Sequence, residues 1–339
     1  MRARIPGGEV AISTLQALMR LAIECGTPRI QLTTRANLQI RGLDDPMPPD
    51  VAERMADIGL LPSMTHERAR NIIAAPTNQL IRERARLLDR MLQARPALAD
   101  LPGRFLFLLT DRTGLGLTEP YDIAYVDRGD GTGTLLADGR GRPCDADSAL
   151  EAALELAERF LSERADERVW NIRDRPPESP LLDTFESVSA TAGAPLVPGP
   201  LNDDLVVGVP LGLLEPAQLT ALESVADSVV VTPWRALLVE GGAEHAGTLA
   251  ASGLITTSQS TWVRLSACPG APHCARALSE TLNLARECAA QLPVEGPRVH
   301  LVGCERRCGH PRGENVTVVG ARDPADVRDA ITRSVPSSA

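Results

Sequence analysis

Four of the seven cysteines of this chain lie near its C-terminal end in two closely spaced pairs. Cys268 and Cys274 form a C-x5-C pair, and Cys304 and Cys308 form a C-x3-C pair. Thiolates are soft ligands that suit zinc or an iron–sulfur cluster. Zinc sites usually have shorter spacings, so the wide first pair favours a 4Fe-4S cluster. Glycine and proline surround both pairs and predict loops. The alternative is that some of these cysteines are only small core residues.

Arginines form the second group of residues that could do chemistry. The chain contains no lysine, so all 35 of its basic side chains are guanidinium groups. A guanidinium pairs with a carboxylate through two parallel hydrogen bonds, so arginines that converge on one cavity would bind a polyanion. Surface arginines that contact only solvent are the alternative. The arginines predicted to lie in loops are Arg35, Arg41, Arg68, Arg70, Arg104, Arg112, Arg235, Arg306, Arg307 and Arg312.

The five histidines do not identify a metal site. His273 and His310 neighbour the cysteine pairs, and His66 precedes an arginine-rich segment, whereas His245 and His300 stand elsewhere. A mononuclear iron would need about two histidines and a carboxylate. No such set can be selected from the sequence, because each histidine alone is more often a hydrogen-bonded structural residue.

Two further features are interpreted as structural. Cys25, Cys144 and Cys288 lie away from the paired cysteines, and Cys288 falls on an apolar stripe with Leu278, Leu282, Ala285 and Ala289. The glycine-rich residues 129–133 lack the strand-then-helix context of a phosphate loop. They predict a hairpin turn instead.

The composition indicates a chain of two or three domains with a large core, because it has 339 residues. No segment approaches the roughly 18 apolar residues of a membrane span. The net charge of −9 argues against nucleic-acid or membrane-surface partners, which favour basic surfaces. The odd number of unevenly placed cysteines does not fit a secreted disulfide framework, so we expect a cytoplasmic protein.

The first 60 residues predict a small α/β half-domain. Residues 2–5 favour a strand, and apolar residues at helical spacing between Leu15 and Ile23 predict an amphipathic helix. Residues 29–33 and 37–41 favour two strands, and residues 49–57 a second helix. Such a unit would leave an open sheet edge, so it needs a partner.

An internal repeat supplies that partner. Residues 209–212 mirror residues 5–8, and residues 231–239 mirror residues 33–41, with an offset that falls from 204 to 198. A looser echo relates residues 70–76 to 263–269 and puts Ala75 where the second copy has Cys268. We therefore predict a duplicated chain in which only the second copy carries the cluster.

The predicted organisation has four parts. A helix at 148–163 and a proline-rich linker at 176–180 separate the two copies. The parts are a first half-domain at 1–60, a first α/β domain at 61–175, a second half-domain at 181–252, and a second α/β domain at 253–333 that carries the cysteine pairs.

Residues 33–42, Arg70 with Asn71, residues 101–105 and the two cysteine pairs together resemble the nitrite and sulfite reductase superfamily over nearly the whole chain. That resemblance implies a duplicated fold of mixed α+β and α/β type, in which two ferredoxin-like half-domains pair into one domain beside two α/β domains. It also implies that Cys268, Cys274, Cys304 and Cys308 hold a 4Fe-4S cluster next to a tetrapyrrole. The residues implied to bind the tetrapyrrole are Arg35, Asn37, Gln39, Arg70, Asn71, Arg104 and Arg235.

Within the superfamily, residues 66–72, 101–105 and 232–235 resemble the precorrin-3B synthases. The reductases carry a pair of lysines in the loop at 101–106, which bring charge and protons to the bound anion. Here Arg104 replaces one lysine and Leu106 the other. A permanently charged arginine beside an apolar leucine is a poor proton donor, which favours the synthase.

The resemblance implies an O2-dependent monooxygenase of aerobic cobalamin biosynthesis. Such an enzyme hydroxylates precorrin-3A at C20 and closes a γ-lactone, with electrons from NADH through a reductase or a ferredoxin. A mononuclear non-haem iron is a further cofactor to be sought. The alternatives are a siroheme-dependent nitrite or sulfite reductase and a non-catalytic four-cysteine metal-binding protein. Relatives usually carry a short segment before the first strand, so a shortened N-terminus would affect the substrate lid.

Overall fold

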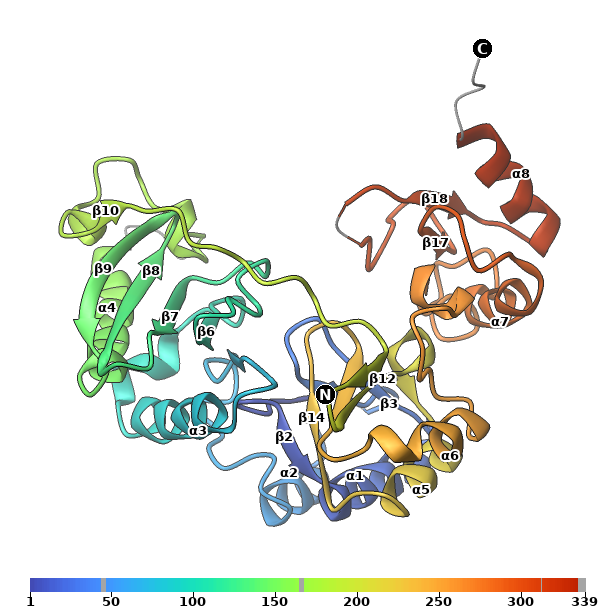
Figure 1. The fold of residues 1–339 in the computed structure, drawn as a ribbon, viewed down its shortest axis with the longest axis horizontal. Helices are drawn as coiled ribbons and strands as arrows, with labels where there is room; N and C mark the ends of the chain where they lie inside the picture. The colour runs from blue at the N-terminus through green and yellow to red at the C-terminus, as the bar shows by residue number, and fades with distance from the viewer. Residues whose placement is uncertain (44–46, 165–167, 312, 335–339) are drawn as a thin grey trace.

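The computed structural model describes residues 1–43, 47–164, 168–311 and 313–334. Figure 1 shows a central unit with an α/β lobe on either side of it. We call the lobe that contains β6 to β10 the first lobe and the lobe that contains β17 and β18 the second lobe. None of the helices in the described ranges is long and apolar enough to cross a membrane.

Two antiparallel sheets form the central unit, with strand orders β1-β4-β3-β13 and β11-β12-β15-β14-β2. Their strands are β1 (Arg2–Ala3), β2 (Glu9–Ala11), β3 (Ile30–Leu32), β4 (Leu38–Gln39), β11 (Gly199–Leu201), β12 (Asp204–Gly208), β13 (Leu213–Leu214), β14 (Ser228–Val231) and β15 (Ala236–Val239). The helices are α1 (Ile12–Glu24), α2 (Pro49–Asp57), α5 (Pro216–Glu223) and α6 (Ala246–Ala251).

Each half of the repeat contributes one strand to the sheet of the other half. In one exchange β13 pairs with β3, and Leu214 lies opposite Ile30. In the other β2 pairs with β14, and Val10 lies opposite Val229. The two pairings are equivalent, since Val10 precedes Leu214 by 204 residues and Ile30 precedes Val229 by 199. The open edge predicted for the first half is therefore closed by the second.

The change in offset comes from one helix. Helix α1 has 13 residues and α5 has 8, and this difference of five takes the offset from 204 before the helices to 199 after them. The sequence comparison predicted an offset of 198 residues between the two hairpins, which is one residue less than the structure shows. In the structure, the N–H of Thr33 donates to the Asn37 carbonyl, and the N–H of Thr232 donates to the Ala236 carbonyl. These equivalent hydrogen bonds are 199 residues apart.

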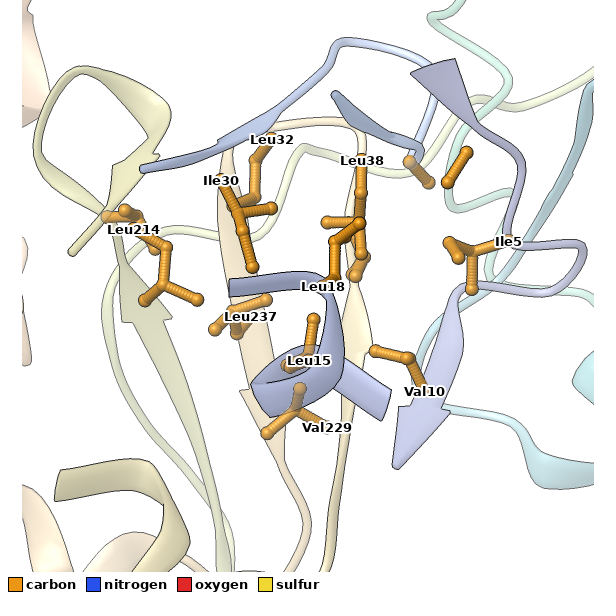
Figure 2. Close-up of a cluster of buried hydrophobic side chains, with 14 of the residues drawn as sticks. Ile5, Val10, Leu15, Leu18, Ile30, Leu32, Leu38, Leu214, Val229 and Leu237 are labelled. Carbon is orange, nitrogen blue, oxygen red and sulfur yellow. The ribbon is translucent and has the colours of Figure 1, made fainter. Parts of the chain in front are cut away.

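Helix α1 lies between the two central sheets. Figure 2 shows Leu15 and Leu18 among side chains from both, including Leu38 of β4 and Leu237 of β15. Burying each leucine stabilises the unit by about 1.5 to 3 kcal/mol. The predicted apolar stripe is confirmed except at Ile23, which is 49% exposed.

The first lobe is built on a six-stranded sheet of order β10-β9-β8-β7-β6-β5, in which β5, β6 and β7 are parallel. Antiparallel pairing of β7 with β8 confirms the predicted turn at 129–133. The elements are β5 (Ile72–Ala74), β6 (Phe107–Thr110), β7 (Ile123–Asp127), β8 (Thr132–Ala137), β9 (Arg140–Asp145), β10 (Glu186–Ser187), α3 (Gln79–Gln93) and α4 (Ala149–Glu163).

The second lobe is smaller and has three parallel strands in the order β16-β17-β18. Its elements are β16 (Leu265–Ala267), β17 (Val299–Val302), β18 (Val316–Val319), α7 (Thr281–Gln291) and α8 (Pro324–Ser334). Short 3₁₀ helices connect elements throughout the chain: η1 (Pro96–Asp100), η2 (Ile172–Asp174), η3 (Pro180–Leu182), η4 (Pro210–Gly212), η5 (Ala243–His245) and η6 (Thr261–Arg264).

The structure corrects three predicted boundaries. The strand predicted at 2–5 ends at Ala3, and a separate strand follows at Glu9–Ala11. Phe185 packs in the first-lobe core and β10 joins the first-lobe sheet, so that lobe extends to residue 187 rather than ending at 175. Leu278 precedes α7 and is 84% exposed, so the buried stripe of this helix begins at Leu282.

Candidate functional site

The two cysteine pairs lie in loops at one edge of the second-lobe sheet. Cys268 follows β16 directly, and Cys304 follows β17 by two residues. Because β16 and β17 are adjacent and parallel, both loops leave the sheet at the same edge. The N–H of Leu278 donates to the Gly303 carbonyl, which ties the first loop to the second. The predicted loop placement of both pairs agrees with the structure.

The four thiols themselves are not gathered around one point. Cys268 is buried and its Sγ accepts the N–H of Gly303 at 3.3 Å, whereas Cys308 is exposed. Within the described ranges, no three histidine, cysteine, aspartate or glutamate side chains are arranged to hold a metal ion. All four cysteines are free thiols. This donor set fits an iron–sulfur cluster in kind, and the ligand assignment stays a prediction.

Three predicted residues meet at the loop 101–105 of the first lobe. Nη1 of Arg35 and Nδ2 of Asn71 both donate to the Gly103 carbonyl, at 3.1 and 3.2 Å. Asn37 donates to Oδ1 of Asn71 at 3.2 Å and accepts the N–H of Ile5. The two asparagines are 1% and 0% exposed. They were predicted to contact a ligand, but in the structure they hold backbone segments together.

Arg70 is held in a buried ion pair. Its side chain is buried, and Nε and Nη2 donate to the two carboxylate oxygens of Asp89 at 2.7 and 2.9 Å. This planar pairing uses the donors that would otherwise bind a ligand carboxylate. In the structure Arg70 forms a buried ion pair that joins the segment before β5 to α3, and its contact with a tetrapyrrole stays a prediction.

Strand register puts polar side chains on the outer face of the four-stranded sheet. Arg2 lies opposite Gln39, and Gln39 lies opposite Gln31, so the three side chains point to the same side. Leu38 points to the other side, into the core. Nε of Arg41 donates to Oε1 of Gln31 at 3.0 Å. We call Arg2, Gln31, Gln39 and Arg41 the polar sheet face.

A pocket connects the polar sheet face to the first cysteine loop. Gln39, predicted at the substrate site, lines it from the sheet, and Pro269 and His273 line it from the loop that carries Cys268 and Cys274. The other lining residues are Thr27, Arg29, Gln31, Arg41, Leu211, Leu213, Ala267 and Leu282.

The polar sheet face continues into Arg35 and Arg104. Burial, followed by the charge of Arg2, lowers the pKa of Arg35 to about 10, and the charge of Arg104 contributes in the same direction. Arg35 stays protonated at neutral pH because this value lies well above 7. Arg104 is exposed, and its guanidinium stacks over the Trp170 ring at 4.3 Å. We call Arg104, Arg35 and the polar sheet face together the arginine band.

Arg235 lies in the turn of the second hairpin, on the side of the second lobe. Its backbone has a left-handed φ of 57°, and its aliphatic stem packs against Gly212. Burial lowers the pKa of Arg235. Its charge adds to the burial that lowers the pKa of His300 on β17. The guanidinium forms no hydrogen bond with the residues that the structure describes.

Two members of the arginine band, Arg2 and Gln31, were not predicted. A signal for Gln31 existed, because the alternation of polar and apolar residues in 29–33 and 37–41 puts Gln31 and Gln39 on one face. Arg2 enters the site only through the register of β1 on β4, which the local sequence pattern does not reveal.

Several other candidate residues have structural roles or remain solvated. His66 is buried and hydrogen-bonds Ser63, Thr65 and the Arg95 carbonyl. Arg112 pairs with Asp130 at 3.3 Å. Arg68, Arg306 and Arg307 are exposed, and Arg312 lies outside the described residues.

Leu106 stands where the resemblance puts a reductase lysine. Its side chain is completely buried in the central core, and its backbone N–H donates to Asp122 at 2.9 Å. This position therefore offers no group that can carry a proton to the arginine band.

The comparisons with known proteins agree with this architecture. Residues 1–58 match the family model of the nitrite/sulfite reductase ferredoxin-like half domain. Similar proteins include a ferredoxin–nitrite reductase from Leptolyngbya laminosa, 25% identical, and a precorrin-3B synthase from Sinorhizobium sp, 27% identical. Both alignments cover 95% of this chain, and they cover 76% and 77% of those relatives.

A further relative is the ferredoxin–nitrite reductase from Synechococcus elongatus, with 25% identity over 95% of this chain and 76% of its own length. Among solved structures, the NirA protein of Mycobacterium tuberculosis superposes with a TM-score of 0.63 at 18% identity, over 90% of this chain and 67% of that one. Residues 1–58 are thus a nitrite/sulfite reductase ferredoxin-like half domain, and the whole chain has the fold of the nitrite and sulfite reductases, with similar proteins of that superfamily spanning 95% of its length.

Proposed function

We propose that this chain is an oxidoreductase of the precorrin-3B synthase type, which hydroxylates precorrin-3A at C20 with O2 and closes a γ-lactone. The observation that carries the proposal is the arginine band, which runs across one sheet face and ends at the pocket beside the first cysteine loop. Precorrin-3A carries several acetate and propionate groups, and fixed positive charges with amide donors are the groups that bind such carboxylates.

The charge of the band supports a polyanionic ligand. Burial and then the charges of Arg4 and Arg41 lower the pKa of Arg2, and burial together with the charges of Arg2, Arg4 and Arg104 lowers that of Arg35, which means that these positive charges lie close together. The chain as a whole has a net charge of −9, so this concentration of positive charge is local. An anionic ligand would relieve the repulsion, because opposite charges within a few ångströms favour the charged form of each arginine.

The reaction needs one O2, two electrons and two protons, with one oxygen atom entering the product and the other leaving as water. A 4Fe-4S cluster, when bound by Cys268, Cys274, Cys304 and Cys308, would supply those electrons one at a time from NADH through a reductase or a ferredoxin. The chain's own residues would bind and orient the macrocycle, and the buried side chain of Leu106 would keep that position free of an ionisable group. We place this reaction in the cytoplasm.

A siroheme-dependent nitrite or sulfite reductase is the second candidate. It is favoured by the two nitrite reductases that match this chain over 95% of its length. Reduction of nitrite or sulfite by six electrons consumes several protons, and a lysine-free chain with Leu106 in the loop lacks the donors for that task. A non-catalytic four-cysteine metal-binding protein is a third candidate, to which the arginine band gives no support.

The deciding experiment uses protein that has been purified and reconstituted with iron and sulfide under anaerobic conditions. Adding precorrin-3A, a reductant and ¹⁸O2 should give a product heavier than the substrate by one labelled oxygen atom, with no sulfite or nitrite consumed in a parallel viologen assay. A product without label, or rapid viologen-driven reduction by protein that copurifies with siroheme, would reverse the preference between the first two candidates. Absence of any turnover together with a bound metal would favour the third.

A further inference from the structure

A hydrogen-bonded serine–histidine pair connects two strands of the second lobe. Ser266 on β16 lies opposite His300 on β17, and Oγ of Ser266 is 2.9 Å from Nδ1 of His300. The other ring nitrogen, Nε2, is 3.1 Å from the carbonyl oxygen of Cys308. His300 is 0% exposed, whereas Ser266 is half-buried and Cys308 is exposed, so the imidazole itself is shielded from water. The imidazole thus connects the sheet to the second cysteine loop.

The tautomer of this imidazole follows from its partners. A carbonyl oxygen can only accept, so Nε2 must carry the proton that is donated to Cys308. Nδ1 of the neutral ring then accepts, and the Ser266 hydroxyl donates to it. The carbonyl of Val299 is 3.3 Å from the same hydroxyl and is the longer of its two possible acceptors. The two hydrogen bonds therefore run in one direction: the Ser266 hydroxyl donates to His300, and His300 donates to the Cys308 carbonyl.

The first lobe shows that the fold does not need this pair. Ile73 on β5 lies opposite Leu108 on β6, in the register that Ser266 and His300 occupy on β16 and β17. Ile73 and Leu108 are 1% and 0% exposed, so the equivalent place is filled by an apolar contact. Burying a polar ring costs free energy unless it is fully hydrogen-bonded. The second lobe therefore has a polar pair at a position where an apolar pair is sufficient for the packing of the sheet.

The loop that His300 reaches is the exposed part of the cysteine region. Residues 305–310 are exposed, and the N–H of Arg307 donates to the Cys304 carbonyl to close the turn between the two cysteines. Arg307 has a left-handed φ of 47°. The His310 ring stacks edge-on against His300 at 5.8 Å. Packing against the core is slight here, so the hydrogen bond from the buried His300 ring to Cys308 has a large share in fixing the loop.

We propose that His300 is a positioning residue, which holds the backbone of Cys308 so that the C-x3-C loop keeps one conformation for its thiols. This inference rests on the proposed function, since it assigns the loop to ligand binding. It uses the neutral ring as a hydrogen-bond bridge, and Ser266 fixes which way the ring points.

The test compares His300→Leu, His300→Gln and Ser266→Ala with a matched surface control, His245→Leu. Leucine is the residue at the equivalent place in the first lobe, so the His300→Leu chain should fold. In metal-free protein, amide hydrogen exchange at residues 304–309 should rise roughly three- to tenfold, as expected for the loss of one hydrogen bond. Glutamine keeps a hydrogen-bond donor, so His300→Gln should show a smaller rise in exchange. The rise in Ser266→Ala should lie between those of His300→Leu and His300→Gln.

A second measurement reads iron and sulfide per chain after identical reconstitution, and the EPR spectrum of the reduced protein. His300→Leu should hold less than half the cluster of the parent chain, with a broadened spectrum, whereas His245→Leu should match the parent. Unchanged exchange at 304–309 in both His300→Leu and Ser266→Ala would overturn the inference. If the parent chain bound no cluster while the exchange difference persisted, the proposed function would fail and the positioning role of His300 would stand.

Discussion

The two α/β lobes share a strand register but differ in the side chains at the edge where their loops emerge. In the first lobe the N–H of Ala75 donates to the strand beside it, as the N–H of Cys268 does in the second. Arg112 follows β6 by two residues, as Cys304 follows β17. The first lobe forms this edge without a thiol, so the cysteines of the second lobe are not required by the fold. A difference between equivalent positions in a repeat thus separates residues kept for chemistry from residues kept for packing.

The largest effect that this comparison predicts is the loss of the cluster from the second lobe. Cys304→Ser removes one of the four thiolates that the proposed cluster needs, so the reconstituted protein should lose its iron, its sulfide and its broad visible absorbance. Iron and sulfide analysis and absorption spectroscopy measure this loss. Cys144→Ser in the first lobe is the matched control and should leave all three unchanged, because Cys144 lies on β9. Full iron and sulfide content in Cys304→Ser would refute the ligand assignment.

The next effect concerns stability and lies in the first lobe. Arg70 and Asp89 have side chains that are 3% and 11% exposed and form a bidentate pair, whereas Val263 stands in the place of Arg70 in the second copy. Arg70→Leu leaves the Asp89 carboxylate buried without its partner, which should lower the free energy of unfolding by about 3 to 5 kcal/mol. Urea denaturation measures this change.

Two controls separate this role from ligand binding. The double variant Arg70→Leu with Asp89→Leu should recover most of the lost stability, because no unpaired charge remains. Arg104→Ala should change the stability by less than about 1 kcal/mol, since that side chain is exposed. A stable Arg70→Leu chain with weakened tetrapyrrole binding would restore Arg70 to the ligand site.

Binding by the arginine band should show smaller changes. Arg35→Gln and Arg104→Gln each remove one charge from the band and should weaken binding of a porphyrin octacarboxylate by about 1.5 to 3 kcal/mol. Fluorescence titration at low and high salt measures the affinity, and the difference should shrink as salt screens the charges. Arg159→Gln, on the exposed side of α4, is the control. Equal losses in all three variants would show that the band is not the binding site.

The contrast between the two copies also explains what could be predicted from the sequence. The pairing of two equivalent halves and the buried face of α1 follow from the repeat and from periodicity, and the cysteine loops follow from local glycine and proline. The exchanged strands β2 and β13 were not predicted, because each is only two or three residues long. The role of Arg70 could not be predicted, because its partner Asp89 lies 19 residues away on a helix whose packing no local pattern encodes. Arg2 was missed for the same reason, since only strand register puts it beside Gln39.

The smallest effect concerns the two equivalent hairpin turns. Ala36 and Arg235 occupy the same turn position, with left-handed φ values of 51° and 57°. The left-handed conformation costs a non-glycine residue about 1 to 2 kcal/mol, and substitution by glycine removes this cost. Glycine in turn costs about 0.5 to 1 kcal/mol, because it loses more conformational freedom on folding. Ala36→Gly should therefore raise the free energy of unfolding by no more than about 1.5 kcal/mol, measured by urea denaturation.

Arg235→Gly tests whether the same strain is kept for a purpose in the second copy. Relief of the backbone should be partly cancelled, because the arginine stem no longer packs on Gly212. Stability should change less than in Ala36→Gly, while binding of the porphyrin octacarboxylate should weaken, since strain that persists at a charged residue points to a use for that charge. If Arg235→Gly were more stable than the parent and bound the porphyrin equally well, Arg235 would belong with Ala36 as a residue of the turn alone.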